Sequence, residues 1–100
     1  MTKITEPQIG KAVLKILSDR PGGTATIEQL KKALPDFVDL SAEDRKPSET
    51  RKGEEMWEQQ LRNLVSHREA EGNIIAEGYA THEPGSLTIT PAGLQYAKRY

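Results

Sequence analysis

The chain has 100 residues, enough for one domain, and its charges nearly cancel, with Lys+Arg 14 against Asp+Glu 15. It has no cysteine, which excludes disulfides, a thiolate nucleophile and a thiolate metal site. No apolar signal segment opens it and no apolar run approaches the roughly 20 residues of a membrane span, so we expect a cytoplasmic protein without membrane contact.

The first predicted helix begins after Thr5. Gln8 completes a capping box with Thr5, and Pro7 is tolerated in the first turn. Apolar residues then recur at helical spacing and predict one buried stripe, made of Ile9, Val13, Ile16 and Leu17. Pro21-Gly22-Gly23 ends this helix, and Thr24-Ala25 suits a short extended pairing segment.

A second helix is predicted after Thr26, with Gln29 at the capping-box position and Pro35 at its end. Its apolar stripe consists of Ile27, Leu30 and Leu34. Residues 36–40 are too apolar for a solvated linker, so we expect a turn that plugs the core with Phe37, Val38 and Leu40.

Residues 41–52 are dense in charge, and we expect a mobile loop with one helical turn after Ser41. Glu54 and Glu55 then mark the start of a third helix, where acidic residues are favoured. The buried side of this helix is predicted to carry Trp57, Leu61, Leu64 and Val65. Trp57 is expected to anchor the core, with its indole nitrogen satisfied at an edge.

Gly72-Asn73 is expected to end the third helix and to begin a β-hairpin. One predicted strand contains Ile74, Ile75 and Tyr79, and the other contains Leu87 and Ile89 in alternation with threonines. The turn sequence 82–86 lies between them. Thr90-Pro91 then opens a last short helix that carries Leu94 and Tyr96.

This order predicts an α+β fold of the winged helix-turn-helix class. The expected parts are three helices, a C-terminal β-hairpin wing and a short terminal helix, in a single domain that spans residues 1–100. A lone hairpin is marginal in water, so this one must pack on the helices.

The third helix carries a polar stripe opposite its apolar side. Residues three and four apart share a helix face, which groups Gln59, Arg62, Asn63 and Ser66. Arginine can pair with guanine and amide side chains with adenine, so this face is predicted to contact bases in the major groove. Arg51, Lys52 and His67 are the candidate phosphate contacts. The alternative is an ordinary solvated helix face.

The residues give no support for catalysis in this chain. His67 and His82 are the only histidines and lie far apart in the sequence, which argues against a zinc site. Ser66 and His67 are neighbours on a helix and point apart, so they do not form a nucleophile pair. Because no glycine-rich phosphate loop is present either, we expect a binding protein without metal or cofactor.

A family resemblance supports the same class. The segment LSAEDRKPSETRKGEEMWEQQLRNLVSHREAEGNIIAEGY and the following GSLTITPAG resemble the N-terminal winged-helix domain of Mrr-like restriction proteins and related winged helices joined to nucleases. The matching features are the start at Leu40 to Asp44, the helix opened by Trp57, and the close at Leu87 to Gly93. The resemblance implies a DNA-reading module of a restriction or defence system, with plain or modified double-stranded DNA as partner and any nuclease domain outside this chain.

Charge leaves a rival interpretation open. Free-standing DNA-binding domains are usually basic, whereas this chain has a formal net charge of -1, and its predicted wing carries His82 and Glu83 but no lysine or arginine. A protein-interaction winged helix, such as a homodimer, would fit these features. A transcriptional regulator would use the same DNA contacts and differ only in the consequence of binding.

Overall fold

The computed structural model describes residues 3–48 and 53–99, and within them the chain forms four α-helices and a three-stranded sheet. The elements follow in the order α1 (Glu6–Ser18), β1 (Thr24–Thr26), α2 (Ile27–Ala33), α3 (Met56–Ser66), β2 (Ala80–Glu83), β3 (Ser86–Ile89) and α4 (Pro91–Ala97). Short 3₁₀ turns follow α1 and α2 at Pro21–Gly23 and Leu34–Asp36. The predicted order of helices, short strand and C-terminal hairpin is confirmed.

The two predicted capping boxes begin α1 and α2. The Thr5 hydroxyl accepts from the Gln8 N–H while the Gln8 side chain accepts from the Thr5 N–H, and Thr26 and Gln29 repeat this pattern. Each pair satisfies backbone donors that the first helical turn leaves without partners. Local sequence therefore determines where both helices begin.

The sheet joins segments from both ends of the chain. Its strand order is β1-β3-β2 and both pairs are antiparallel. Ala25 lies opposite Leu87, and both side chains are buried. On the other face the hydroxyls of Thr24 and Thr88 are 2.8 Å apart and hydrogen-bonded. The apolar face of the sheet is thus turned toward the helices.

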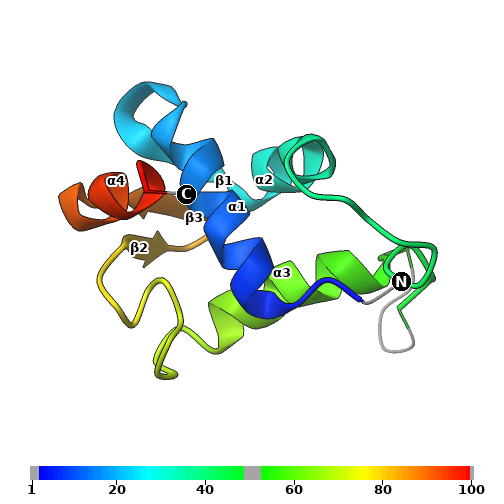
Figure 1. The fold of residues 1–100 in the computed structure, drawn as a ribbon. Coiled ribbons are helices and arrows are strands. Elements are labelled where there is room, and N and C mark those ends of the chain that lie inside the picture. Colours follow the sequence, from blue (N-terminus) through cyan, green and yellow to red (C-terminus); the bar gives the residue numbers. More distant parts are fainter. Residues whose placement is uncertain (1–2, 49–52, 100) are drawn as a thin grey trace.

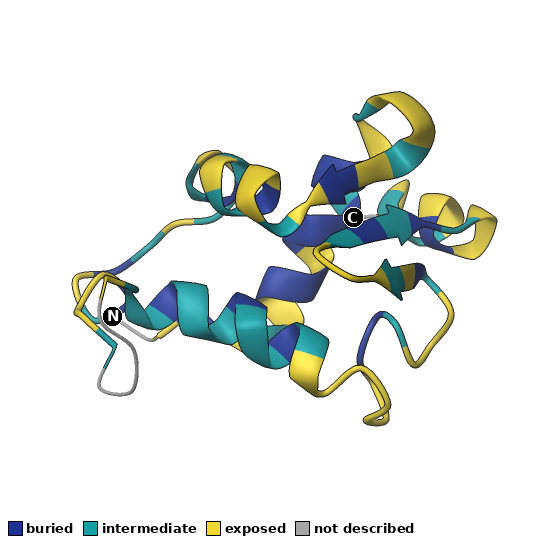
Figure 2. Cartoon of the chain, turned by 180° about the vertical axis from the view of Figure 1, so that it is seen from behind, coloured by how far each residue is buried: buried dark blue, intermediate teal, exposed yellow. Residues whose placement is uncertain are grey.

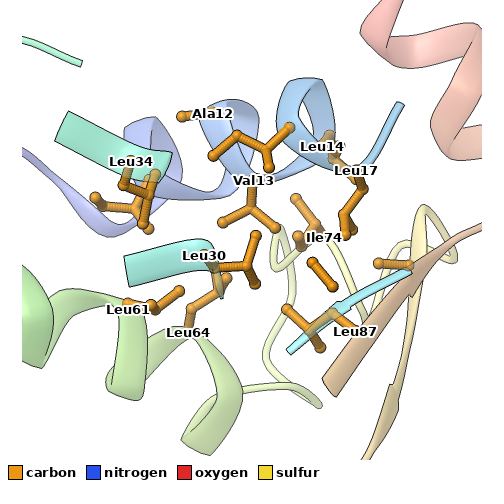
Figure 3. Close-up of a cluster of buried hydrophobic side chains, with 14 of the residues drawn as sticks. Ala12, Val13, Leu14, Leu17, Leu30, Leu34, Leu61, Leu64, Ile74 and Leu87 are labelled. Atoms are coloured by element: carbon orange, nitrogen blue, oxygen red, sulfur yellow. The ribbon is translucent and has the colours of Figure 1, made fainter. Parts of the chain in front are cut away.

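The core lies where α1 crosses the other helices and the sheet (Figure 1). In Figure 3 Val13 lies between the rest of α1 and the side chains of Leu30, Leu61 and Leu64. The fully enclosed large side chains are Ile9, Val13, Leu14, Leu17, Leu30, Leu34, Leu61, Leu64 and Leu87. The predicted stripe of α1 is buried throughout, whereas Ile27 of α2 and Val65 of α3 are only half-buried.

Thr90 fastens the start of α4 to the segment just before β2. Its hydroxyl accepts from the Gly93 N–H, as a helix cap, and donates to the Gly78 carbonyl at 2.6 Å. Gly93 is buried so closely against the Tyr79 carbonyl that no side chain fits there. The rings of Tyr79 and Tyr96 stack with centroids 4.5 Å apart. The predicted Thr90-Pro91 helix start is confirmed.

Residues 74–79 are not a strand, which corrects the prediction for Ile74, Ile75 and Tyr79. The side chain of Asn73 donates to the Leu64 carbonyl and accepts from the Ile75 N–H, and these bonds fold the segment into turns. Strand β2 begins only at Ala80. The third helix also ends earlier than expected, at Ser66. His67 is its C-terminal cap, and the His67 N–H donates to the Asn63 and Val65 carbonyls.

The segment before α3 also departs from expectation. Asp44 lies in a turn and is 2% exposed, because its carboxylate accepts from the Ile4 and Ser41 N–H groups. Residues 41–48 are therefore anchored to the N-terminal segment rather than forming a mobile loop, and the predicted turn after Ser41 is present, with the Arg45 N–H bonded to the Ser41 carbonyl. Residues 49–52 of the predicted loop lie outside the described part of the chain. Val38 and Leu40 pack against the core as predicted, but Phe37 is 44% exposed and does not plug it.

No helix in the described part of the chain is long and apolar enough to cross a membrane.

Candidate nucleic-acid interface

Helix α3 begins with an acidic, heavily bonded turn. Trp57 is buried, and its indole N–H donates to Glu55 Oε1 at 2.8 Å, so its predicted role as a core anchor is confirmed. The Glu55 N–H donates to the Glu58 carboxylate. The backbone of residues 46–48 pairs with that of residues 54–56 through Ser48 N–H to Glu54 and Met56 N–H to Lys46. These bonds fix the direction in which α3 leaves the loop.

The predicted polar stripe lies on one face of α3, as its spacing requires. Gln59, Arg62 and Asn63 are half-buried and Ser66 is exposed. Figure 2 shows the same gradation, with most of α3 coloured intermediate and its C-terminal end exposed. The stripe is therefore accessible mainly toward the end of the helix.

Two members of the stripe are engaged within the protein. The Ser48 hydroxyl donates to Gln59 Oε1 at 2.9 Å. The Arg62 guanidinium donates from Nε at 3.3 Å and from Nη2 at 2.9 Å to the same oxygen, Oε1 of Glu54. Among the described residues, the side chains of Asn63 and Ser66 have no hydrogen-bond partner. Asn63 and Ser66 are thus the stripe members presented to a ligand without prior rearrangement.

The candidate phosphate contacts are less well supported by position. His67 caps the end of α3, and its Nδ1 lies 2.9 Å from Oε1 of Glu6 at the start of α1, which draws the ring away from the stripe. Arg51 and Lys52 lie outside the described residues. Lys31 of α2, which was not predicted from sequence, reaches α3 and lies 3.9 Å from Glu58.

A groove of about 240 Å³ runs between α2, α3 and the hairpin. The lining residues include Arg62 and Ser66 from α3, Ile27 and Lys31 from α2, His82 from β2, and Glu54 from the segment just before α3. The Ile27 N–H donates to the Gly85 carbonyl at 2.9 Å, so the hairpin turn is fixed against the start of α2. The hairpin therefore forms a wall of this groove.

Sequence reasoning missed Glu54, Lys31 and His82 as parts of this surface. Glu54 precedes Arg62 by eight residues and stands outside the helix, so helical spacing gives no reason to pair them. Lys31 and His82 come from other elements, and only the packing of α2 and the hairpin against α3 brings them close. The one available signal was the density of acidic residues just before α3.

The cations around α3 are largely balanced by carboxylates. Arg45 lies 3.6 Å from Glu55, Lys46 lies 2.9 Å from Glu43, and Lys31 also lies 3.8 Å from Glu28. Paired charges add little long-range attraction for a polyanion. Within the described residues, no group of three histidine, aspartate or glutamate side chains is placed to hold a metal ion.

Comparison of the chain with protein-family models, with curated proteins and with solved structures finds no significant match in any of the three.

Proposed function

We propose that the chain is a winged helix-turn-helix domain that binds double-stranded DNA with α3 in the major groove. The observation that supports this most is the topology. Helices α1, α2 and α3 precede the hairpin, and β1 adds to it in the order β1-β3-β2, which is the order in which a winged helix has its recognition helix third; on α3 the polar stripe is half-buried at Gln59, Arg62 and Asn63 and exposed at Ser66.

The side chains on this face suit base edges. Asn63 can pair with N6 and N7 of adenine, and the Ser66 hydroxyl can donate to or accept from a base edge. Arg62 can pair with guanine once it leaves Glu54. The hairpin has a short turn that is tied to α2, and β2 ends with the acidic Glu83, so specific contacts would come from α3 rather than from the wing. The resemblance to Mrr-like winged helices supports restriction or defence as the setting, with a nuclease outside this chain.

Fluorescence anisotropy with labelled duplexes, plain and methylated, tests the proposal at low and at moderate salt. The double variant Arg62→Ala/Asn63→Ala is expected to weaken binding by at least about 30-fold, because it removes two base contacts that contribute about 1–3 kcal/mol each. A matched control is Gln95→Ala/Arg99→Ala, which removes an amide and an arginine from exposed positions on and after α4. Equal losses from both double variants would contradict base contacts by α3.

The charge pairing favours a second candidate, a protein-interaction winged helix. The carboxylates beside Lys31, Arg45 and Arg62 leave little positive field on this face, as the formal net charge of -1 also indicates. Sedimentation at several protein concentrations, together with the same anisotropy titration, separates the two. A mass that rises with concentration and no duplex binding at low salt would favour the protein partner.

A further inference from the structure

The pairing of Arg62 with Glu54 has the geometry of an internal competitor for DNA. The Glu54 side chain is 10% exposed and the Arg62 side chain is 31% exposed, so the pair is partly withdrawn from water at the edge of the groove. Nε and Nη2 of Arg62 form the side-on edge of the guanidinium, and both are directed at one carboxylate oxygen. Arginine uses such edges to bind paired acceptors.

We propose that Glu54 acts as a latch on Arg62, holding it in the free protein and yielding it only to DNA that offers a competing set of acceptors. This inference rests on the proposed function. The acceptors are the O6 and N7 atoms of guanine or the oxygens of a backbone phosphate, which share the same chemistry toward a guanidinium.

Two physical effects act in the same direction. Glu54 occupies the edge of Arg62 that would otherwise bind the nucleic acid, so Arg62 must give up the Glu54 carboxylate before it can bind DNA. The Glu54 carboxylate also repels phosphates that approach the groove, and the low exposure of its side chain limits screening by salt. DNA that offers no acceptors to Arg62 gains nothing in return for breaking the ion pair and for the repulsion by Glu54. Glu54 would therefore help to determine which DNA is bound.

The backbone holds the latch in place independently of Arg62. The Ser48 N–H donates to the Glu54 carbonyl at 2.7 Å, and the pairing of residues 46–48 with 54–56 positions Glu54 before α3 begins. Replacement of its carboxylate by an amide keeps the shape and leaves these backbone bonds intact. We therefore expect that the charge of Glu54 can be removed with α3 kept in place by these backbone bonds.

The test compares duplex binding by the wild-type chain, Glu54→Gln and Glu43→Gln. Glu43 also forms an ion pair, at 2.9 Å with Lys46, but it does not line the groove. Glu43→Gln therefore changes the net charge by the same amount as Glu54→Gln without affecting Arg62. Glu54→Gln is expected to bind about three- to tenfold more tightly, as suits the release of a partly exposed ion pair. Glu43→Gln is expected to change affinity by less than about twofold.

A double-mutant cycle with Arg62→Ala distinguishes the latch from a general loss of negative charge. In that background the part of the gain that comes from releasing Arg62 should disappear, and only the gain from reduced repulsion of phosphates should remain. If the affinity of Glu54→Gln falls more steeply with salt than that of the wild-type chain, by about one phosphate contact, the released Arg62 binds the DNA backbone. If the salt dependence is unchanged and Glu54→Gln discriminates more strongly among duplexes, Arg62 binds a base. Thermal unfolding checks that each variant is folded. Glu54→Ala, which also removes the carboxylate, is measured as a second variant in case Glu54→Gln does not fold.

The outcomes separate the two proposals. If the wild-type chain binds duplex and Glu54→Gln binds no better, or gains equally with and without Arg62, the latch is wrong and the proposed function stands. If neither the wild-type chain nor Glu54→Gln binds any duplex at low salt, the proposed function is wrong and the latch falls with it.

Discussion

Ile4 and Asp44 are joined by a hydrogen bond of 2.9 Å, from the Ile4 N–H to Asp44 Oδ1, across forty residues of chain. The other carboxylate oxygen accepts from the Ser41 N–H, and the Asp44 carbonyl accepts from the Trp57 N–H. One residue thereby fastens the N-terminal segment, the turn before α3 and the first turn of α3. The presentation of α3 depends on this junction.

Replacement Asp44→Asn is expected to reduce the free energy of unfolding by about 1–3 kcal/mol. The amide keeps one acceptor oxygen but turns an NH₂ group toward a backbone N–H, which leaves buried donors without a partner. Urea denaturation measures the loss. The control Asp39→Asn changes an exposed carboxylate and should shift stability by less than about 0.5 kcal/mol; equal losses would contradict the role of Asp44.

The stability gap between the wild-type chain and Asp44→Asn should depend on pH. Burial raises the pKa of Asp44, but hydrogen bonds from Ser41 and Ile4 lower it more, so its pKa lies below the ordinary value of 3.8. A depressed pKa in the folded state stabilises fully above the unfolded value, and this stabilisation is lost as the pH falls through the folded value. Urea unfolding between pH 7 and pH 2 should show a constant gap above about pH 5 and a shrinking gap below the ordinary aspartate pKa. A gap that stays constant to pH 2 would argue against this linkage.

Leu61→Ala should cost far more stability than Phe37→Ala. Leu61 is fully buried beneath α1, and truncation there removes apolar contacts and leaves a cavity, for an expected loss of about 2–5 kcal/mol. Phe37 is 44% exposed, so its truncation should cost less than about 1 kcal/mol. Thermal or chemical unfolding ranks the two. A larger loss at Phe37 would mean that this ring is covered in solution.

Gly93→Ala should be much more damaging than Gly10→Ala. A Cβ at Gly93 would overlap the Tyr79 carbonyl, which is backbone and cannot move without disturbing the hairpin. At Gly10 the new Cβ would lie 3.1 Å from Cγ2 of Ile74, the end of a side chain that can shift. We expect at least about 3 kcal/mol of destabilisation at Gly93 and a net change within about 1 kcal/mol at Gly10, because there the gain in helix propensity offsets the displacement of a neighbour that can move. Similar melting temperatures for the two variants would contradict this ranking.

Much of the fold could be predicted because its signals are local. Thr5 with Gln8 and Thr26 with Gln29 begin helices by bonds that span three residues, and the Thr90 hydroxyl does the same for α4 by accepting from the Gly93 N–H. The segment 74–79 failed for the opposite reason. Its apolar residues have the composition of a strand, but the Asn73 side chain bonds the Leu64 carbonyl nine residues back and curls the segment into turns. Composition carries no trace of such a bond.

The candidate surface was predictable only as a list of side chains on one helix face. Spacing correctly groups Gln59, Arg62 and Asn63, because that depends on helix geometry alone. It does not reveal that Glu54 holds Arg62 or that Ser48 bonds Gln59, since both contacts depend on how residues 46–48 fold against 54–56. The electrostatic character of the surface therefore belongs to the tertiary structure.

The strand order β1-β3-β2 also bears on how the chain acquires its structure during synthesis. The middle strand, Ser86–Ile89, is translated last of the three, so β1 has no neighbour to pair with while α1, α2 and α3 leave the ribosome. Until Leu87 arrives opposite Ala25, the apolar sides of α1 and α2 lack the sheet that covers them. Such distant pairings slow folding and prolong exposure to aggregation. We therefore expect a nascent chain stalled before Ser86 to be protease-sensitive and bound by chaperones, and to become resistant once β3 has emerged.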